Sequence, residues 1–235
     1  MNKGENESVS VRNLVEFILR SGDLDNTKGK KDAEAMLAGT RIHKKIQKSQ
    51  PASYKAEVPL KVELLVEDGE ESFMLTVEGR ADGIIEGDPV IIDEIKSMYI
   101  NVEKLEEPVP VHLAQAKCYA YIYALQNSCE LMGVRMTYVS IETENSRLFH
   151  SEYSFSELKE WFNNLVKEYS KWLLFERHWG RIRNESIKKL QFPFEYRPGQ
   201  KDFVAGVYRS IQREKMLFVE APTGVGKTIS TIFPA

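Results

Sequence analysis

The sequence predicts an α/β fold, in which a mixed central sheet flanked by helices is followed by a second, shorter α/β segment. Three observations predict it. Between residues 54 and 96, apolar side chains recur with a period of about two, which is the spacing of β-strands. Apolar residues at helical spacing precede and follow this run. Towards the end of the chain, a glycine-rich loop stands between a short apolar run and a helix-like stretch.

The elements are expected in a regular order along the chain. Apolar periodicity predicts helices around residues 11–19, 31–49, 111–128 and 154–190. We expect the first helix to stop at Ser21-Gly22, the second to be interrupted near Gly39-Thr40, and the last to start at a capping Ser154 or Ser156. Asp-Gly and Gly-Asp-Pro turns divide residues 54–96 into three or four strands, and a further hairpin is expected at residues 135–143 and 147–154.

A break near residue 190 predicts two domains, residues 1–190 and residues 191–235. The segment "QFPFEYRPGQ", residues 191–200, contains two prolines and a glycine and interrupts the helical pattern. After it we expect a helix, a short strand at "MLFVE", residues 216–220, the glycine-rich loop and a second helix.

Composition excludes several classes of protein. The chain has 235 residues, 42% of them apolar, and a net charge of −3, so any nucleic-acid binding must depend on local basic patches. Cys118 and Cys129 are too few for a disulfide framework, which indicates a reducing cytoplasm. They are also too few for an iron–sulfur cluster, which needs about four ligands. The polar N-terminal segment lacks the apolar stretch of a signal peptide, and no run approaches the roughly 20 apolar residues of a membrane span.

Charged residues lie within apolar strands in "VEGRADGIIEGDPVIIDEIKS", residues 77–97. Glu94 and Lys96 are two apart, so they share a strand face, and Asp93 points to the other face. Asp82 lies on the preceding strand of a tight hairpin and can reach Glu94. Two neighbouring carboxylates repel each other unless a cation lies between them, which favours Mg²⁺ or Mn²⁺. A hairpin with solvated charges and a Glu94–Lys96 pair remains the alternative.

Further residues accompany these charges in a recognisable order. His43 falls on an expected helix, Gly79 to Asp82 form a Gly-x-x-Asp motif, Glu94 to Lys96 form Glu-x-Lys, and Gln115 and Tyr119 are four apart on one helix. In this order, residues 8–190 resemble the PD-(D/E)XK nuclease superfamily, in the branch of RecB-type and CRISPR-associated exonucleases.

The resemblance implies a central mixed sheet flanked by helices and a metal-dependent phosphodiesterase site. The implied metal ligands are His43, Asp82, Glu94 and the carbonyl of Ile95. The implied catalytic residues are Asp82, Glu94, Lys96, Gln115 and Tyr119. Many members of the superfamily have four cysteines that hold an iron–sulfur cluster, and this sequence has only two.

The loop "APTGVGKT", residues 221–228, is a phosphate-binding motif with Ala at the usual first Gly. Backbone N–H groups around Gly224 and Gly226 would face phosphate oxygens, Lys227 would reach the β- and γ-phosphates, and Thr228 would ligate Mg²⁺. With "RPGQ" upstream, residues 192–235 resemble the start of a DinG/XPD-type superfamily 2 helicase. The implied nucleotide-binding residues are Arg197, Gln200, Thr223, Gly224, Val225, Gly226, Lys227 and Thr228.

Together, the motifs predict a Mg²⁺- or Mn²⁺-dependent deoxyribonuclease domain fused to the start of an ATP-dependent helicase, with single-stranded DNA as its partner. We expect the chain to be a fragment of a longer helicase–nuclease, because the acidic box and the second motor lobe that ATP hydrolysis needs are missing. One alternative is a DNA-binding accessory domain with a degenerate nuclease site. Another, a nucleotide-binding switch protein, would need a complete phosphate-loop domain.

Overall fold

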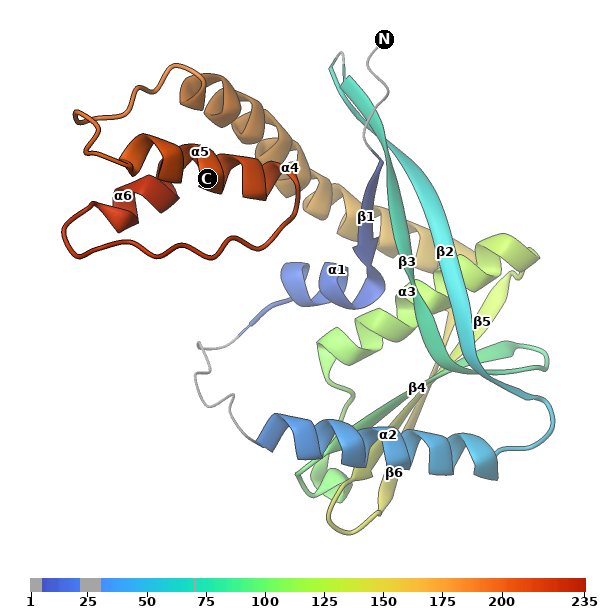
Figure 1. The fold of residues 1–235 in the computed structure, drawn as a ribbon. Helices are drawn as coiled ribbons and strands as arrows, with labels where there is room; N and C mark the ends of the chain where they lie inside the picture. Colours follow the sequence, from blue (N-terminus) through green and yellow to red (C-terminus); the bar gives the residue numbers. More distant parts are fainter. Residues whose placement is uncertain (1–5, 22–30, 70) are drawn as a thin grey trace. The chain divides into compact units, whose positions relative to one another are not determined.

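The computed structural model describes residues 6–21, 31–69 and 71–235. The chain divides into two compact units, Met1–Glu176 and Arg177–Ala235 (Figure 1). This division falls within a long helix rather than at the proline-rich segment near residue 190, where the sequence predicted a boundary. Among the described residues, no helix is long and apolar enough to cross a membrane.

The first unit is built on a six-stranded mixed sheet, as the sequence predicted (Figure 1). Its strands are β1 (Glu7–Ser10), β2 (Tyr54–Asp68), β3 (Glu71–Ile85), β4 (Val90–Met98), β5 (Leu131–Ser140) and β6 (Ser146–Ser154). They lie in the order β1-β3-β4-β5-β6, and β2 pairs with β3. The β1–β3 and β4–β5 pairs are parallel, whereas the other neighbours are antiparallel.

Helices cover both faces of β4. The helices of the chain are α1 (Val11–Ile18), α2 (Lys31–Ser49), α3 (Pro110–Asn127), α4 (Phe155–Ile187), α5 (Gln200–Gln212) and α6 (Lys227–Ile232), with a short 3₁₀ turn at Val102–Lys104. Lys96 of β4 bonds to Gln115 of α3, whereas Asp93 shares Arg135 with Gln50, just after α2. Because neighbouring side chains on a strand alternate in direction, α3 and α2 lie on opposite faces of this strand.

Three local features of the first unit differ from the sequence prediction. The strand β1 was not predicted, because four residues with a polar pattern give no clear period. The helix that follows starts when the side chain of Ser10 accepts the Asn13 N–H, and it ends at Ile18, before the predicted stop. The predicted interruption of α2 at Gly39 is wrong: a Cβ there would lie 2.9 Å from Ser97 Oγ, so this glycine allows close packing of a continuous helix on β4.

Other predictions are confirmed. Residues 54–98 form three strands, residues 131–154 form a hairpin, and one helix covers residues 110–127. The long helix α4 is capped by Ser154, whose hydroxyl accepts the Glu157 N–H at 3.3 Å while Glu157 Oε2 accepts the Ser154 N–H at 2.8 Å. This reciprocal pair is the capping box that the sequence "SFSE" indicated.

A buried ion pair ties the sheet to the end of α2. Asp93 is fully buried and accepts two bonds from Arg135, at 2.9 and 2.7 Å, one from Thr137 at 2.7 Å and one from Tyr54 at 3.0 Å. Arg135 also donates to Gln50 Oε1 at 2.9 Å. With this many partners, the Asp93 carboxylate is satisfied within the protein and has a structural role.

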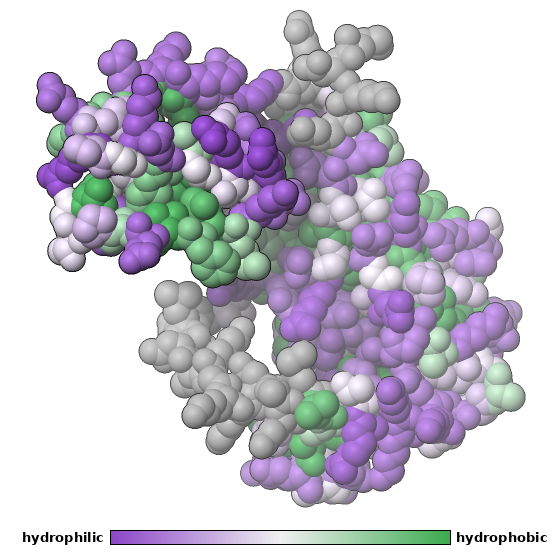
Figure 2. Space-filling view, viewed as in Figure 1, coloured by the Kyte–Doolittle hydropathy of each residue, from purple (hydrophilic) through white to green (hydrophobic). Residues whose placement is uncertain are grey.

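The second unit contains the end of α4, then α5 and α6, and its described residues include no strand. The predicted strand at residues 216–220 is therefore wrong. A strand needs a neighbour to satisfy its backbone groups, and residues 177–235 offer none. The apolar side chains of this segment are exposed, with Met216 at 87% and Phe218 at 89%, and Figure 2 shows apolar residues at the surface of this unit.

Replacing Arg135 with Met should destabilise the first unit by about 3–5 kcal/mol, because it leaves the buried Asp93 carboxylate without its charge partner. Urea unfolding followed by circular dichroism measures this change. Lys61→Ala is the matched control, since Lys61 pairs with Glu63 on the exposed surface of the same sheet, and it should leave the midpoint unchanged. An unfolding midpoint for Arg135→Met equal to that of Lys61→Ala would contradict the structural role of the pair.

Candidate functional site

Strand β4 presents a buried carboxylate next to a lysine. Glu94 is 1% exposed, and its Oε1 lies 2.8 Å from Lys96 Nζ. The two side chains share the strand face that α3 covers, as their spacing predicted. The Glu–Lys pair is therefore formed inside the protein and not on a solvated hairpin, which was the alternative reading of the sequence.

The point where β3 and β4 part brings Asp82 to this pair. The antiparallel β3–β4 pairing ends at Gly83 and Asp93. One residue beyond it, Asp82 Oδ2 accepts the Ile95 N–H at 2.8 Å, so a carboxylate takes the position that a strand carbonyl would otherwise fill. The contact that the structure shows between Ile95 and the site is therefore made by the Ile95 N–H, which donates to Asp82.

Helix α2 holds Asp82 from a third direction. His43 Nδ1 lies 3.5 Å from Asp82 Oδ1, and Gln47 Nε2 donates to the Asp82 carbonyl at 2.9 Å. His43 and Gln47 are four residues apart and so lie on one helical face. Sequence reasoning missed Gln47, although its spacing from His43 was a usable signal.

Helix α3 adds an ordered polar pair to the site. Gln115 Oε1 accepts from Lys96 Nζ at 3.0 Å, and Gln115 Nε2 donates to the Tyr119 hydroxyl at 3.4 Å. A Cβ at Gly79 would lie 2.7 Å from that hydroxyl, so a residue without a side chain is needed there to admit Tyr119. The structure thus brings together all four motifs that the sequence singled out.

The electrostatics of Glu94 are unbalanced. Burial raises the pKa of Glu94 to about 8, an effect that Lys96 opposes and that Asp82 strengthens. Among the described residues, Glu94 Oε2 is the buried side-chain oxygen that has no hydrogen-bond partner. Such an atom is rare in folded proteins, and it leaves room for one more positive partner at this carboxylate.

The donor set fits a divalent cation in part. Glu94 Oε2 has no partner, and Asp82 Oδ1 has only the long contact to His43, so both oxygens are available to a hard cation such as Mg²⁺ or Mn²⁺. Within residues 6–21, 31–69 and 71–235, however, no three His, Cys, Asp or Glu side chains stand close enough to form a ready-made metal cluster. The chemistry of these oxygen donors suits a divalent metal, although the described side chains do not stand as a formed metal cluster.

The glycine-rich loop lies in the second unit and contains two residues in the left-handed conformation. Gly224 and Gly226 have φ angles of +84° and +83°, which favour glycine. Lys227 Nζ donates to the carbonyls of Ala221 and Pro222, at 3.1 and 2.9 Å. Thr223 and Val225 complete the loop, and Thr228 follows in α6.

Gln200 lies against this loop. It is buried, it accepts the Arg197 N–H at 3.0 Å, and its Nε2 would lie 2.6 Å from a Cβ at Gly226. The Arg197 side chain is exposed. The structure therefore brings Gln200 into contact with the predicted phosphate loop.

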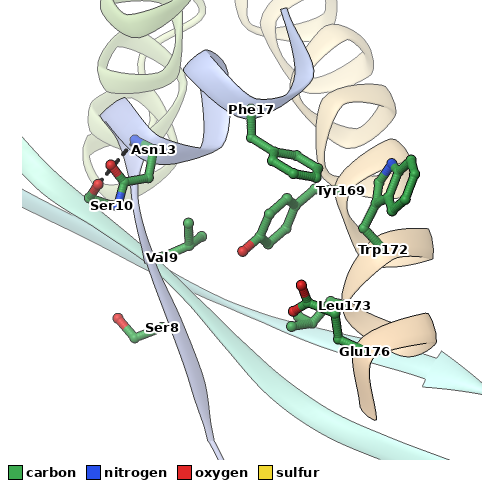
Figure 3. Close-up of a pocket in the computed structure, with 9 residues that line it drawn as sticks. All are labelled: Ser8, Val9, Ser10, Asn13, Phe17, Tyr169, Trp172, Leu173 and Glu176. Atoms are coloured by element: carbon green, nitrogen blue, oxygen red, sulfur yellow. Dashed lines mark hydrogen bonds between the residues drawn. The ribbon is translucent and has the colours of Figure 1, made fainter. Parts of the chain in front are cut away.

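A separate hollow of about 290 Å³ lies between β1, α1 and α4. Figure 3 shows Phe17 pointing toward Tyr169 and Trp172, with Glu176 at the same hollow. Both ring pairs are edge-to-face, with centroids 5.8 and 5.9 Å apart. The lining of this hollow includes no lysine or arginine among the described residues.

Comparisons with known proteins leave this chain without an assigned family. No protein-family profile and no curated protein matches it. Several solved structures are similar in part, among them the following two. SSO0001 has a TM-score of 0.42 and 18% identity over 69% of this chain and 76% of its own. An alkaline exonuclease from Laribacter hongkongensis has a TM-score of 0.43 and 12% identity over 78% of this chain and 95% of its own. At TM-scores below 0.5, neither likeness assigns a function.

The raised pKa of Glu94 predicts a pH-dependent stability in the presence of EDTA. Below pH 4.5, the ordinary pKa, both folded and unfolded states hold the Glu94 proton, whereas up to about pH 8 only the folded state keeps it. Rising pH therefore favours the unfolded state through this group, by at most about 1.4 kcal/mol per pH unit. Relative to Glu94→Gln, the wild type should lose unfolding free energy between about pH 5 and 8. A difference between the two proteins that stays constant with pH would contradict the buried, protonated carboxyl.

Proposed function

We propose that residues 1–176 form a metal-dependent deoxyribonuclease of the PD-(D/E)XK type. The observation that carries the proposal is the buried Glu94, which has Lys96 on one oxygen, no partner on the other, and Asp82 nearby. A purely structural carboxylate would be satisfied on both oxygens, as Asp93 is one residue earlier.

Asp82, Glu94 and His43, together with the carbonyl of Ile95, are the proposed ligands of Mg²⁺ or Mn²⁺. When bound, such a metal would supply an activated water and neutralise charge that develops on the phosphate. The contacts to Ile95 and Gln47 orient Asp82 for this role. His43 stands at the outer side of Asp82, where it can complete the ligand set.

Lys96 is the proposed catalytic cation. Its side chain is 22% exposed, so the ammonium is confined but reachable by a phosphate. Gln115 fixes its direction, and Tyr119 in turn fixes Gln115. A positioned ammonium stabilises the negative charge that builds on a phosphate oxygen in the transition state.

The proposed substrate is DNA, single-stranded in the first instance. Lys44 and Lys48 follow His43 on α2, are exposed, and have no ion-pair partner among the residues that the structure describes. Arg41 and Lys45 of the same helix are instead paired with Glu144. The two unpaired lysines can follow a nucleic-acid backbone past the site.

For residues 177–235 we infer a role in nucleotide binding, as the opening part of a helicase motor of the DinG/XPD type. The left-handed glycines of the loop and the packing of Gln200 against Gly226 support this. Lys227 now donates to loop carbonyls, and a nucleotide phosphate would have to replace these bonds. ATP hydrolysis by such a motor requires an acidic box and a second motor lobe. We therefore expect the wild-type chain to hydrolyse ATP no faster than its Lys227→Ala variant.

The competing function is a DNA-binding accessory domain whose nuclease site has degenerated. Cleavage separates the two, since both bind DNA. We expect the full chain to cut a labelled single-stranded oligonucleotide in Mn²⁺ and not in EDTA. Asp82→Asn and Glu94→Gln should each lower the rate by at least about 10²-fold, because each removes a metal-binding charge. Glu63→Gln, an exposed acid on β2, should cut normally. Binding without Mn²⁺-dependent cleavage would support the accessory domain.

Lys96→Met should abolish most cleavage, by about 10²–10³-fold, without weakening Mn²⁺ binding. The ammonium now competes with any cation for Glu94, so its removal should leave Mn²⁺ affinity equal or higher in calorimetry. Lys61→Met on β2 is the control for a lost surface charge. A Lys96→Met protein that cuts within a few-fold of wild type would rule out a catalytic role for this lysine.

A further inference from the structure

A third polar residue lies on the active face of α3. His112, Gln115 and Tyr119 are at spacings of three and four residues, so they follow one another along a single helical stripe. Gln115 and Tyr119 already belong to the candidate site through Lys96. His112 extends the stripe by one turn towards the start of the helix.

Tyr138 connects His112 to the same place on the sheet. In the parallel β4–β5 pair, Tyr138 lies opposite Lys96 in register. Side chains opposite each other in a ladder point to the same face. The Tyr138 ring lies 5.8 Å from the His112 ring, and its hydroxyl lies 3.3 Å from His112 Nδ1. His112 therefore lies next to the candidate site, because it contacts Tyr138, the residue opposite Lys96.

The Tyr138 hydroxyl sets which ring nitrogen of His112 carries the proton. Tyr138 is fully buried, and its oxygen accepts the Val109 N–H at 2.9 Å. Its own proton needs an acceptor, and His112 Nδ1 is the one that the structure provides. Nδ1 therefore accepts, and Nε2 carries the hydrogen.

His112 is neutral and its donor is free. Burial, together with the positive charge of Lys96, lowers the pKa of His112 to about 4; Arg12 lowers it slightly further, and Glu16 has a small opposing effect. The side chain is only half-buried, and Nε2 has no hydrogen-bond partner within the described residues. A neutral N–H beside the catalytic lysine can approach a phosphate without disturbing the Lys96–Glu94 pair.

We propose that His112 is a further substrate-binding residue, whose Nε2–H donates to a non-bridging oxygen of a DNA phosphate next to the one at Lys96. The proposal rests on the function proposed above, because it takes Lys96 to mark the scissile phosphate. It adds a fixed, uncharged donor to the site, positioned by Tyr138.

Two amide substitutions separate this role from a purely structural one. The amide of Asn reaches about as far from the backbone as Nδ1, and that of Gln about as far as Nε2. His112→Asn can therefore keep the bond to Tyr138 but loses the outer donor, whereas His112→Gln keeps the outer donor.

The experiment measures binding of a fluorescein-labelled single-stranded oligonucleotide by anisotropy, with Ca²⁺ to suppress cleavage, alongside thermal melting. We expect Kd to rise about tenfold for His112→Asn and His112→Ala, and to stay within about threefold for His112→Gln. Cleavage in Mn²⁺ at saturating DNA should change less than Kd in all three.

The outcomes are distinct. If all three variants bind DNA as tightly as wild type, the proposal is overturned. It is also overturned if His112→Asn keeps the wild-type DNA affinity while His112→Gln loses it, because that pattern indicates a structural histidine. If wild type binds DNA but does not cleave it, the nuclease function fails while the His112 result is still read from Kd. If wild type does not bind DNA, both fail.

Discussion

The arrangement of the site depends on one unbalanced carboxylate. Glu94 lies in the interior with Lys96 on one oxygen and nothing on the other. Burying a charge that is only half compensated is unfavourable, and the carboxyl responds by holding its proton, with a pKa of about 8. The neighbouring Asp93 is equally buried but fully satisfied. The contrast between these two adjacent acids on one strand supports the proposal that Glu94, and not Asp93, binds a cation.

The fold holds this carboxylate in place from three sides. Strands β3 and β4 part where Asp82 replaces a ladder carbonyl at Ile95. Helix α2 fixes Asp82 through Gln47, while helix α3 fixes Lys96 through Gln115. The Asp93–Arg135 pair on the opposite face anchors the same strand. The site is therefore assembled from segments that are far apart in the sequence.

Much of this was predictable from the sequence, for physical reasons. Period-two spacing gave the direction of Asp93, Glu94 and Lys96, and helical spacing put Gln115 and Tyr119 on one face. What could not be predicted depended on tertiary contacts. Glycine usually disfavours a helix, and the sequence does not show that Gly39 is needed for close packing of α2 against Ser97. The strand predicted at residues 216–220 has the right composition but no neighbour to pair with among residues 177–235. Side-chain contacts across elements, such as Tyr138 with His112, leave no periodic signal.

The most direct test of a cation-binding carboxylate is a count of the protons that Mn²⁺ displaces. If Glu94 keeps its proton up to about pH 8, Mn²⁺ binding at pH 6.5 must release close to one proton from it. Calorimetric titrations in buffers of different ionisation enthalpy give this number. The structure predicts that wild type releases about one proton more than Glu94→Gln, which should also bind Mn²⁺ more weakly. Equal proton release by the two proteins, or equal Mn²⁺ affinity, would contradict the central role of Glu94.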